Sequence, residues 1–283
     1  MEKFRVLIKS IILTLFYSFK NFFSRNRIAY SNNGVVVSLT TYDQRINSVF
    51  LTIESLINQK RMPSHIVLWL CNEDIINGLP STLIRLKNRG LEIRIVESNI
   101  RSYKKLSYFC LHSNDFNFDF VVTVDDDVFY PSYWLDKLYL KASSNPKSIC
   151  CYRGKSIKFN NDSVDNYLNW SSESDVCNSN PFLLMPTGVS GVCYPKGVIT
   201  SEFYDFDGIE KFCKYADDVW YKLCSIKNNY DAKLVLTDNI HFTPVLTSLA
   251  KGLEVYNVQN GLNEKQFNDS MNYLEVIKND FYK

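Results

Sequence analysis

Short apolar runs alternate with segments of helical spacing through the first half of the chain. Runs typical of buried strands, bounded by turn residues, occur at 34–40, 65–70, 91–96 and 120–124. Apolar residues with helical spacing fall between and after these runs, at 47–58, 79–88, 103–111 and 134–140. This alternation predicts a mostly parallel, doubly wound α/β sheet with helices on both faces.

The second half of the chain is less regular. Residues 160–180 are rich in Asn, Ser and Asp and predict a long polar loop or a loosely structured insertion. Order resumes at 185–195, and a helix is predicted over 210–226 with two aspartates near its middle. A last short strand is predicted at 234–236.

The N-terminal residues differ from the rest. Residues 4–23 are strongly apolar and interspersed with Lys and Arg, and no carboxylate occurs between Glu2 and Asp43. The uninterrupted apolar part, 11–19, is about half of the roughly 20 residues needed to span a bilayer, and no small-residue cleavage site of a signal peptide follows it. A basic, aromatic-rich amphipathic helix is typical of in-plane attachment to a membrane surface. A packing helix and a true span are the alternatives.

Composition narrows the class of protein. With 283 residues, 46% of them hydrophobic, the chain is long enough for a substantial core. We expect a single domain at 31–260, an N-terminal helix within 1–30 and a polar-rich, partly amphipathic tail at 261–283. A net charge of +2 with dispersed Lys and Arg argues against nucleic-acid binding. Eight cysteines without C-x-x-C spacing argue against a zinc site and favour buried free thiols in a reducing, cytoplasmic compartment.

Three consecutive aspartates, Asp125, Asp126 and Asp127, follow the strand predicted at 120–124. Adjacent carboxylates repel one another, so a strand that ends in three of them favours a site where a cation binds. Mg²⁺ and Mn²⁺ take oxygen ligands, commonly one or two carboxylates together with substrate phosphates. Ligands of open α/β sheets bind outside the carboxyl ends of the strands. The cluster therefore predicts a metal–diphosphate site at this edge.

Six segments occur in a fixed order: V-V-V-S-L-T-T-Y-D-Q-R-I at 35–46, L-T-I-E-S-L-I-N-Q at 51–59, S-Y-K-K-L at 102–106, T-V-D-D-D-V-F-Y-P at 123–131, G-V-S-G-V-C-Y-P at 188–195 and A-D-D-V-W-Y at 216–221. Together they resemble the nucleotide-sugar glycosyltransferases of the GT-A fold, and more narrowly a bacterial polysaccharide-synthesis group related to family 2. The resemblance covers about 33–244. It implies a Rossmann-like GT-A domain, Mn²⁺ or Mg²⁺, a UDP-sugar or similar donor, and a glycan or lipid-linked acceptor at the inner face of the cell membrane.

In such enzymes a D-x-D motif binds the ion that bridges to the nucleotide diphosphate. Asp125 and Asp127 match its outer positions. Residues two apart on an extended segment point the same way, so these two are expected to share a face while Asp126 faces elsewhere. The resemblance assigns the ion mainly to Asp127, with Asp125 reaching the ribose or the metal through water. Asp126 is counted with the donor site but is expected to matter least for the metal.

The resemblance also implies residues that bind the rest of the donor. Thr40, Tyr42 and Arg45 follow the first strand, where relatives bind the base and ribose, and Tyr42 is expected to stack on the base. A loop with a surface aromatic is the alternative. Lys104 and Lys105 are expected at a helix start, where backbone N–H groups and the dipole favour phosphate. One lysine is expected to contact the diphosphate and the other to be solvated.

The later motifs imply a general base, a backbone that approaches the donor or acceptor sugar, and a last metal ligand. Asp218 is expected to be the general base, with Asp217 as the alternate, although relatives often have Glu-Asp here; two helix-surface acids are the alternative. Gly188 and Gly191 are expected to let the backbone approach a sugar, unless they only form a turn. His241 is expected to complete the metal shell, unless it is structural.

These assignments predict metal-dependent sugar transfer with inversion at the anomeric carbon. A sugar nucleotidyltransferase is disfavoured because the loop after the first strand reads Thr-Thr-Tyr-Asp-Gln-Arg and lacks the Gly-rich triphosphate loop. A calcium-dependent carbohydrate-binding module would need several dispersed oxygen ligands and no late acid pair. Release of nucleoside diphosphate from a nucleotide-sugar distinguishes the enzyme from this module.

Overall fold

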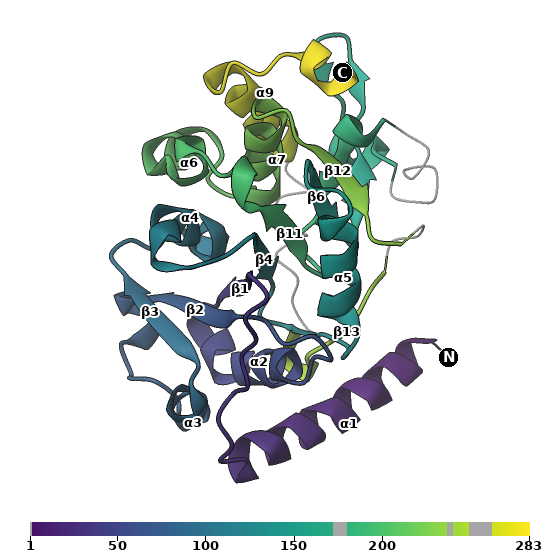
Figure 1. The fold of residues 1–283 in the computed structure, drawn as a ribbon. Coiled ribbons are helices and arrows are strands. Elements are labelled where there is room, and N and C mark those ends of the chain that lie inside the picture. The colour runs from purple at the N-terminus through teal and green to yellow at the C-terminus, as the bar shows by residue number, and fades with distance from the viewer. Residues whose placement is uncertain (1, 172–179, 237–239, 249–261) are drawn as a thin grey trace.

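A computed structural model describes residues 2–171, 180–236, 240–248 and 262–283. Its main element is a seven-stranded sheet with helices on both faces (Figure 1). In spatial order the strands are β12 (Asp231–Leu234), β6 (Ser148–Cys151), β11 (Val192–Pro195), β4 (Phe120–Val124), β1 (Val35–Thr40), β2 (His65–Cys71) and β3 (Glu92–Val96). All neighbours pair in parallel except β11, which runs antiparallel to both β4 and β6. The α/β class and the mostly parallel sheet are thus confirmed.

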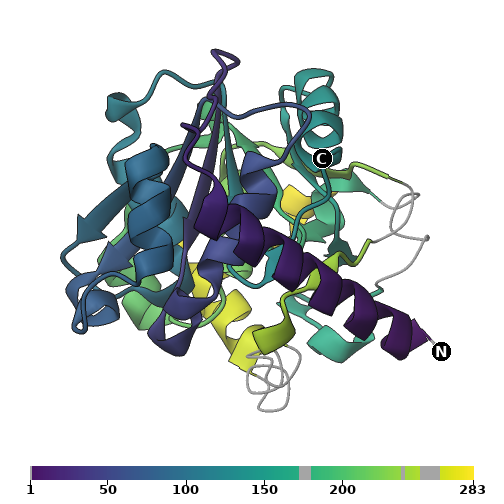
Figure 2. The same cartoon turned by 90° about the horizontal axis from the view of Figure 1, so that it is seen from below.

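The helices form two layers, one on each side of the sheet (Figures 1 and 2). They are α1 (Glu2–Phe23), α2 (Val49–Ile57), α3 (Ser81–Arg89), α4 (Phe109–Leu111), α5 (Trp134–Ser143), α6 (Phe206–Phe212), α7 (Asp217–Lys227) and α9 (Leu262–Tyr273). Short strands lie outside the main sheet: β5 (Val128–Phe129), β7 (Gly154–Ser156), β8 (Phe159–Asn160), β9 (Ser163–Val164), β10 (Leu184–Pro186) and β13 (Thr243–Pro244).

Alternation along the strands divides the core in two. Val36 points to one face and packs with the layer of α4, α6, α7 and α9, whereas Val35 and Val37 point to the other, covered by α2, α3, α5 and one side of α1. Phe267 of α9 is fully buried in the first layer. Both faces are therefore apolar, as expected for a sheet with parallel strands covered on both sides.

The strand registers bring the sequence motifs to one edge. Leu39 lies opposite Val124, so the residues that follow β1 and β4 leave the sheet side by side. Val192 of the antiparallel β11 lies opposite Thr123, so the glycine-containing turn before β11 reaches the same edge. This is the carboxyl edge of the parallel strands, where ligands bind in such sheets.

Most predicted elements of the first half are confirmed, with ends shifted by one or two residues. The bounds of the strand predicted at 234–236 are wrong, because β12 is Asp231–Leu234 and so begins three residues and ends two residues earlier. β12 is an edge strand of mixed polar and apolar residues, so a search for apolar runs does not locate it. Of the predicted polar loop at 160–180, residues 172–179 lie outside the described residues, and the rest contains the β8–β9 hairpin.

The single helix predicted over 210–226 is also wrong, because the segment forms two helices. α6 ends at Phe212 and α7 begins at Asp217. The carbonyl of Cys213 accepts a hydrogen bond from the Tyr103 hydroxyl, a tertiary contact at the break between the helices. The aspartate pair therefore lies in the first turn of α7 instead of mid-helix.

Candidate active site

The turn after β4 is positioned by polar side chains of α2. The Thr52 hydroxyl donates to the Asp126 carbonyl at 2.9 Å, and the Ser55 hydroxyl accepts from the Tyr130 amide at 3.0 Å. The Tyr130 hydroxyl in turn accepts from the Asp125 amide at 3.0 Å. These groups are buried and satisfy backbone atoms of the turn, which otherwise would need water. These hydrogen bonds therefore fix the turn that carries Asp125, Asp126 and Asp127, here called the acid turn.

The side chains of Asp126 and Asp127 share the guanidinium of Arg45. Its Nη1 lies 2.8 Å from Asp126 Oδ1 and 3.1 Å from Asp127 Oδ2. Asp126 also accepts a 2.5 Å hydrogen bond from the Thr41 hydroxyl and is 5% exposed. Asp126 thus links the turn to the loop after β1, and its burial leaves little room for contact with a ligand. Asp127 keeps 26% of its side chain exposed.

Two other residues after β1 differ in their surroundings. The Thr40 hydroxyl donates to the Trp69 carbonyl at 2.8 Å, which ties β1 to β2. Tyr42 is partly exposed, and the Arg45 guanidinium lies 5.2 Å from its ring centroid. The structure therefore gives Thr40 a role in the sheet and leaves part of the Tyr42 ring open beside the acid turn.

Lys105 joins the acid turn to the first turn of α7. Its Nζ lies 2.9 Å from Asp125 Oδ1 and 3.4 Å from Asp217 Oδ2. Asp218 adjoins this pair and accepts a 3.1 Å hydrogen bond from the Gly188 amide. Carboxylates from two elements almost a hundred residues apart thus surround one ammonium group, whose side chain is 8% exposed.

The two lysines are directed apart by an irregular helical segment. A 3₁₀ turn (Arg101–Tyr103) precedes a π turn that begins at Lys104, so the lysines lie inside the segment and not at its start. The helical segment therefore begins earlier than predicted, at Arg101, three residues before Lys104. Lys104 is fully buried and pairs with Asp74, so the prediction that one lysine is solvated is wrong. π turns often occur at functional sites.

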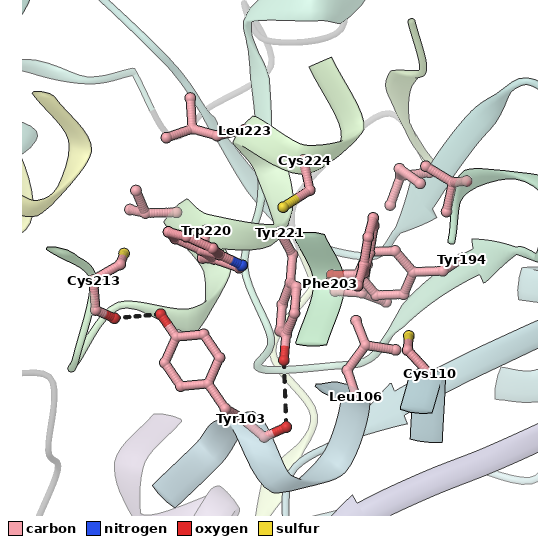
Figure 3. Close-up of a cluster of buried hydrophobic side chains, with 14 of the residues drawn as sticks. Tyr103, Leu106, Cys110, Tyr194, Phe203, Cys213, Trp220, Tyr221, Leu223 and Cys224 are labelled. Atoms are coloured by element: carbon pink, nitrogen blue, oxygen red, sulfur yellow. Dashed lines mark hydrogen bonds between the residues drawn. The ribbon is translucent and has the colours of Figure 1, made fainter. Parts of the chain in front are cut away.

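An aromatic cluster fixes α7 against this segment (Figure 3). The Tyr221 hydroxyl lies 2.8 Å from the Ser107 hydroxyl and donates to the Tyr103 carbonyl at 3.3 Å. Trp220 is fully buried in the same cluster, which makes it a core residue. Tyr221 and Asp217 belong to α7, and Lys105 belongs to the π turn. The contacts that hold these two elements together therefore also set the distance between Asp217 and the lysine.

The two glycines of the turn before β11 have different surroundings. A Cβ atom on Gly188 would lie 3.3 Å from Lys105 Nζ and 3.4 Å from Asp218 Oδ1. Gly191 has φ +92°, and a Cβ there would lie 2.6 Å from Trp134 Cζ2. Gly188 therefore faces the charge cluster, whereas the positive φ of Gly191 and its close approach to Trp134 both require a glycine.

Burial raises the pKa of three carboxyls of the site, those of Asp126, Asp127 and Asp218. The pKa of Asp127 rises to about 6, first because of burial and second because of the neighbouring Asp125 carboxylate. The pKa of Asp218 rises to about 7 through burial and the Asp217 carboxylate, and Lys105 opposes this rise. Two carboxyls therefore titrate near neutral pH, and added positive charge at the turn would stabilise their ionised forms.

The oxygen donors of the turn fit a hard divalent ion. Asp125 and Asp127 are about a quarter exposed, and Mg²⁺ or Mn²⁺ commonly needs only such a pair when phosphates and water complete the shell. His241 is exposed, and no group of three or more His, Cys, Asp or Glu in the described ranges is arranged to bind a metal. The predicted shell of Asp125, Asp127 and His241 is therefore not assembled in the described residues.

Sequence reasoning missed Lys222. It is buried in α7, one turn after Asp218, and lines a small pocket with Asp218 and Tyr194. Within the described part of the chain its ammonium has no hydrogen-bond partner, and burial, opposed by Asp231, lowers its pKa to about 7. The i, i+4 spacing from Asp218 was the available signal, but lysines at that spacing are ordinary on exposed helix faces.

The comparisons with known proteins add no assignment. No protein-family model matches the chain, and no curated protein matches it. The function is therefore inferred from the site at the carboxyl edge of the parallel strands. This site combines the carboxylates of the acid turn and of the start of α7 with the buried ammonium of Lys105 and the backbone amide of Gly188.

Replacing Lys105 by methionine is expected to destabilise the fold in a pH-dependent way. The variant leaves the half-buried carboxylates of Asp125 and Asp217 without their cation, and we expect the free energy of unfolding to fall by about 3 kcal/mol at pH 8. Lys105 lowers the pKa of Asp218, so its loss raises that pKa further above the unfolded value. Stability from a raised carboxyl pKa is present at low pH and lost as pH rises.

The deficit of the Lys105→Met variant should therefore shrink on going from about pH 8 to about pH 5, measured by urea unfolding. Lys158→Met, which removes one charge from an exposed side chain, serves as control. A deficit of equal size at both pH values would contradict the charge cluster.

Proposed function

We propose that the protein is a metal-dependent glycosyltransferase of the GT-A type. It would move a sugar from a nucleotide-diphosphate sugar to a glycan or lipid-linked acceptor, with inversion of the anomeric carbon. The observation that supports this best is the meeting of Asp125 with Asp217 and Asp218 around Lys105. A turn with partly exposed carboxylates and a half-buried candidate base then lie side by side, as a one-step displacement requires.

The donor side of the reaction is assigned to the turn after β4. Asp125 and Asp127 would bind the ion, which neutralises negative charge on the leaving diphosphate when bound. Arg45 and Lys105 already contact these carboxylates, so positive side chains lie where the phosphates would bind. The partly exposed ring of Tyr42, beside Arg45, is the candidate surface for the nucleotide base.

The acceptor side is assigned to the start of α7. Asp218 would take the proton of the acceptor hydroxyl while that oxygen forms its bond to the anomeric carbon. The bond from this carbon to the diphosphate oxygen breaks, and its electron pair leaves with the diphosphate. A base works best when its pKa lies near the working pH, and the pKa of Asp218 is raised to about 7. The Gly188 amide donates to one Asp218 oxygen and orients the carboxylate.

The fold supports the proposal at a coarser level. The site lies at the carboxyl edge of a mostly parallel sheet in which only β11 runs antiparallel. This arrangement is compatible with a Rossmann-like nucleotide-binding domain. Because unrelated functions share such folds, the residues of the site carry the proposal and the fold contributes an analogy.

Variants of the two assigned aspartates should lose sugar transfer. Asp218→Asn removes the base, and we expect turnover to fall about 10²–10⁴-fold. Asp127→Ala removes an ion ligand, and we expect a loss of at least about tenfold, matched by chelation of divalent ions in the unaltered protein. The measurement is release of nucleoside diphosphate from a panel of nucleotide-sugars with a saccharide acceptor.

Asp162→Asn is the matched control, because Asp162 is exposed and outside the site. Near-normal turnover of Asp218→Asn would remove the base assignment, and full activity of Asp127→Ala would remove the ion assignment. Retention at the anomeric centre, read by NMR of the product, would overturn the mechanism while leaving the donor site intact.

The pH profile provides a separate test. The ionised form of Asp218 is the active base, so kcat/KM should rise with an apparent pKa of about 7. Burial and the neighbouring Asp217 carboxylate together cause this raised pKa of Asp218. The residual activity of Asp218→Asn should lack this rise. A profile that is flat between about pH 5 and pH 8 in the unaltered protein would contradict the assignment.

A further inference from the structure

The helix α1 has one face buried on the domain and the opposite face open. Ser10, Tyr17 and Asn21 share the buried face. The other face presents large apolar side chains to solvent: Phe4, Leu7, Ile8, Ile11, Ile12, Leu15, Phe16, Phe19, Phe22 and Phe23. Soluble proteins rarely leave so continuous an apolar stripe without a partner.

Specific contacts fix which face of α1 is open. The Ser10 hydroxyl donates to the Pro244 carbonyl at 2.8 Å, and the Tyr17 ring stacks on Phe129 with centroids 5.6 Å apart. The buried Asn21 amide donates to the Glu54 carboxylate at 3.2 Å. A rotated helix would lose all three contacts, so the apolar face points away from the domain. Figure 2 shows α1 lying along the outside of the molecule.

From Lys3 to Tyr42 every charged side chain is basic. Arg5, Lys9 and Lys20 fall on one flank of the helix at about 100° per residue, between the buried and the open faces. Arg25 and Arg27 follow the helix and are exposed, and no carboxylate occurs between Glu2 and Asp43. Basic side chains beside an apolar face match the headgroups and the acyl boundary of an anionic lipid layer.

We propose that the open face of α1 binds the surface of an anionic bilayer, with the helix axis in the membrane plane. α1 is long and apolar enough to cross a membrane by length and composition. A crossing helix, however, would break the contacts of Ser10 and Asn21 and would carry Lys9 into the hydrocarbon. In the plane, the apolar face is buried and the basic flank reaches the headgroups while the domain contacts persist.

The same helix supports the candidate site. α1 packs against β13, and the next residue, Val245, donates its amide to the Asp127 carbonyl at 2.7 Å. Tyr17 stacks on Phe129, two residues after Asp127. Lipid binding by α1 would therefore place the site at a fixed position relative to the bilayer. The lipid contact itself does not depend on sugar transfer.

Co-sedimentation of the full chain with vesicles tests the proposal. We expect binding to phosphatidylcholine vesicles that contain phosphatidylglycerol, and at least about tenfold weaker binding to phosphatidylcholine alone. The double variant Leu15→Asp, Phe19→Asp should lose at least about tenfold in binding, because both side chains lie on the open face. Ile76→Asp is the matched control, since Ile76 is 79% exposed and is not part of α1.

A second variant tests the charge term separately. Arg5→Glu with Lys9→Glu should weaken binding to the anionic vesicles about tenfold or more, whereas Lys158→Glu should not. These positions are exposed, and thermal unfolding verifies that the variants fold.

Three outcomes would overturn the proposal. The first is equal binding to both vesicle types by the unaltered protein and the variants. The second is that the protein, expressed in cells, stays in the membrane fraction after alkaline extraction, which would show a spanning helix. The third is self-association that the Leu15 and Phe19 variant abolishes, without vesicle binding, which would assign the face to a second copy of the chain.

Discussion

The buried ammonium of Lys105 is the interaction on which the candidate site depends. Asp125 comes from the end of β4, and Asp217 and Asp218 come from the start of α7, so without a cation between them their burial would be strongly unfavourable. Burial alone would lower the pKa of Lys105, yet the three carboxylates raise it well above its usual value. The lysine therefore stays charged, and its charge keeps two distant elements together.

Much of the surrounding core supports this contact. The buried hydroxyls of α2 fix the acid turn, and the Tyr221–Ser107 contact fixes α7 to the π turn that carries Lys105. Gly188 leaves the space in which the ammonium and Asp218 meet. Several independent contacts thus hold the cluster in place. Such support allows a protein to keep carboxyls in an unfavourable environment that raises their pKa values. Such groups are candidates for chemistry because their environment and not their residue type sets their pKa.

The sequence predicts the parts of this arrangement that depend on local pattern. Buried strands are continuous apolar runs, so the end of β4 and its aspartates could be located, and parallel pairing brings them to the edge of β1. The break at Cys213 and the burial of Lys104 with Asp74 could not be predicted, because each depends on a partner that is distant in sequence. The resemblance implies His241 as a metal ligand, and the described residues do not place it in a metal-binding group. The sequence therefore predicts the residues that follow a local pattern, but it does not predict contacts between residues that are distant in sequence.

The most direct test of the central claim is calorimetric titration with uridine diphosphate, with and without Mn²⁺. If the acid turn and Lys105 form the donor site, Mn²⁺ should tighten binding of the diphosphate at least about tenfold, and Asp127→Ala should abolish this gain while Asp162→Asn keeps it. Binding of equal affinity with and without Mn²⁺, or an unchanged gain in Asp127→Ala, would contradict the account.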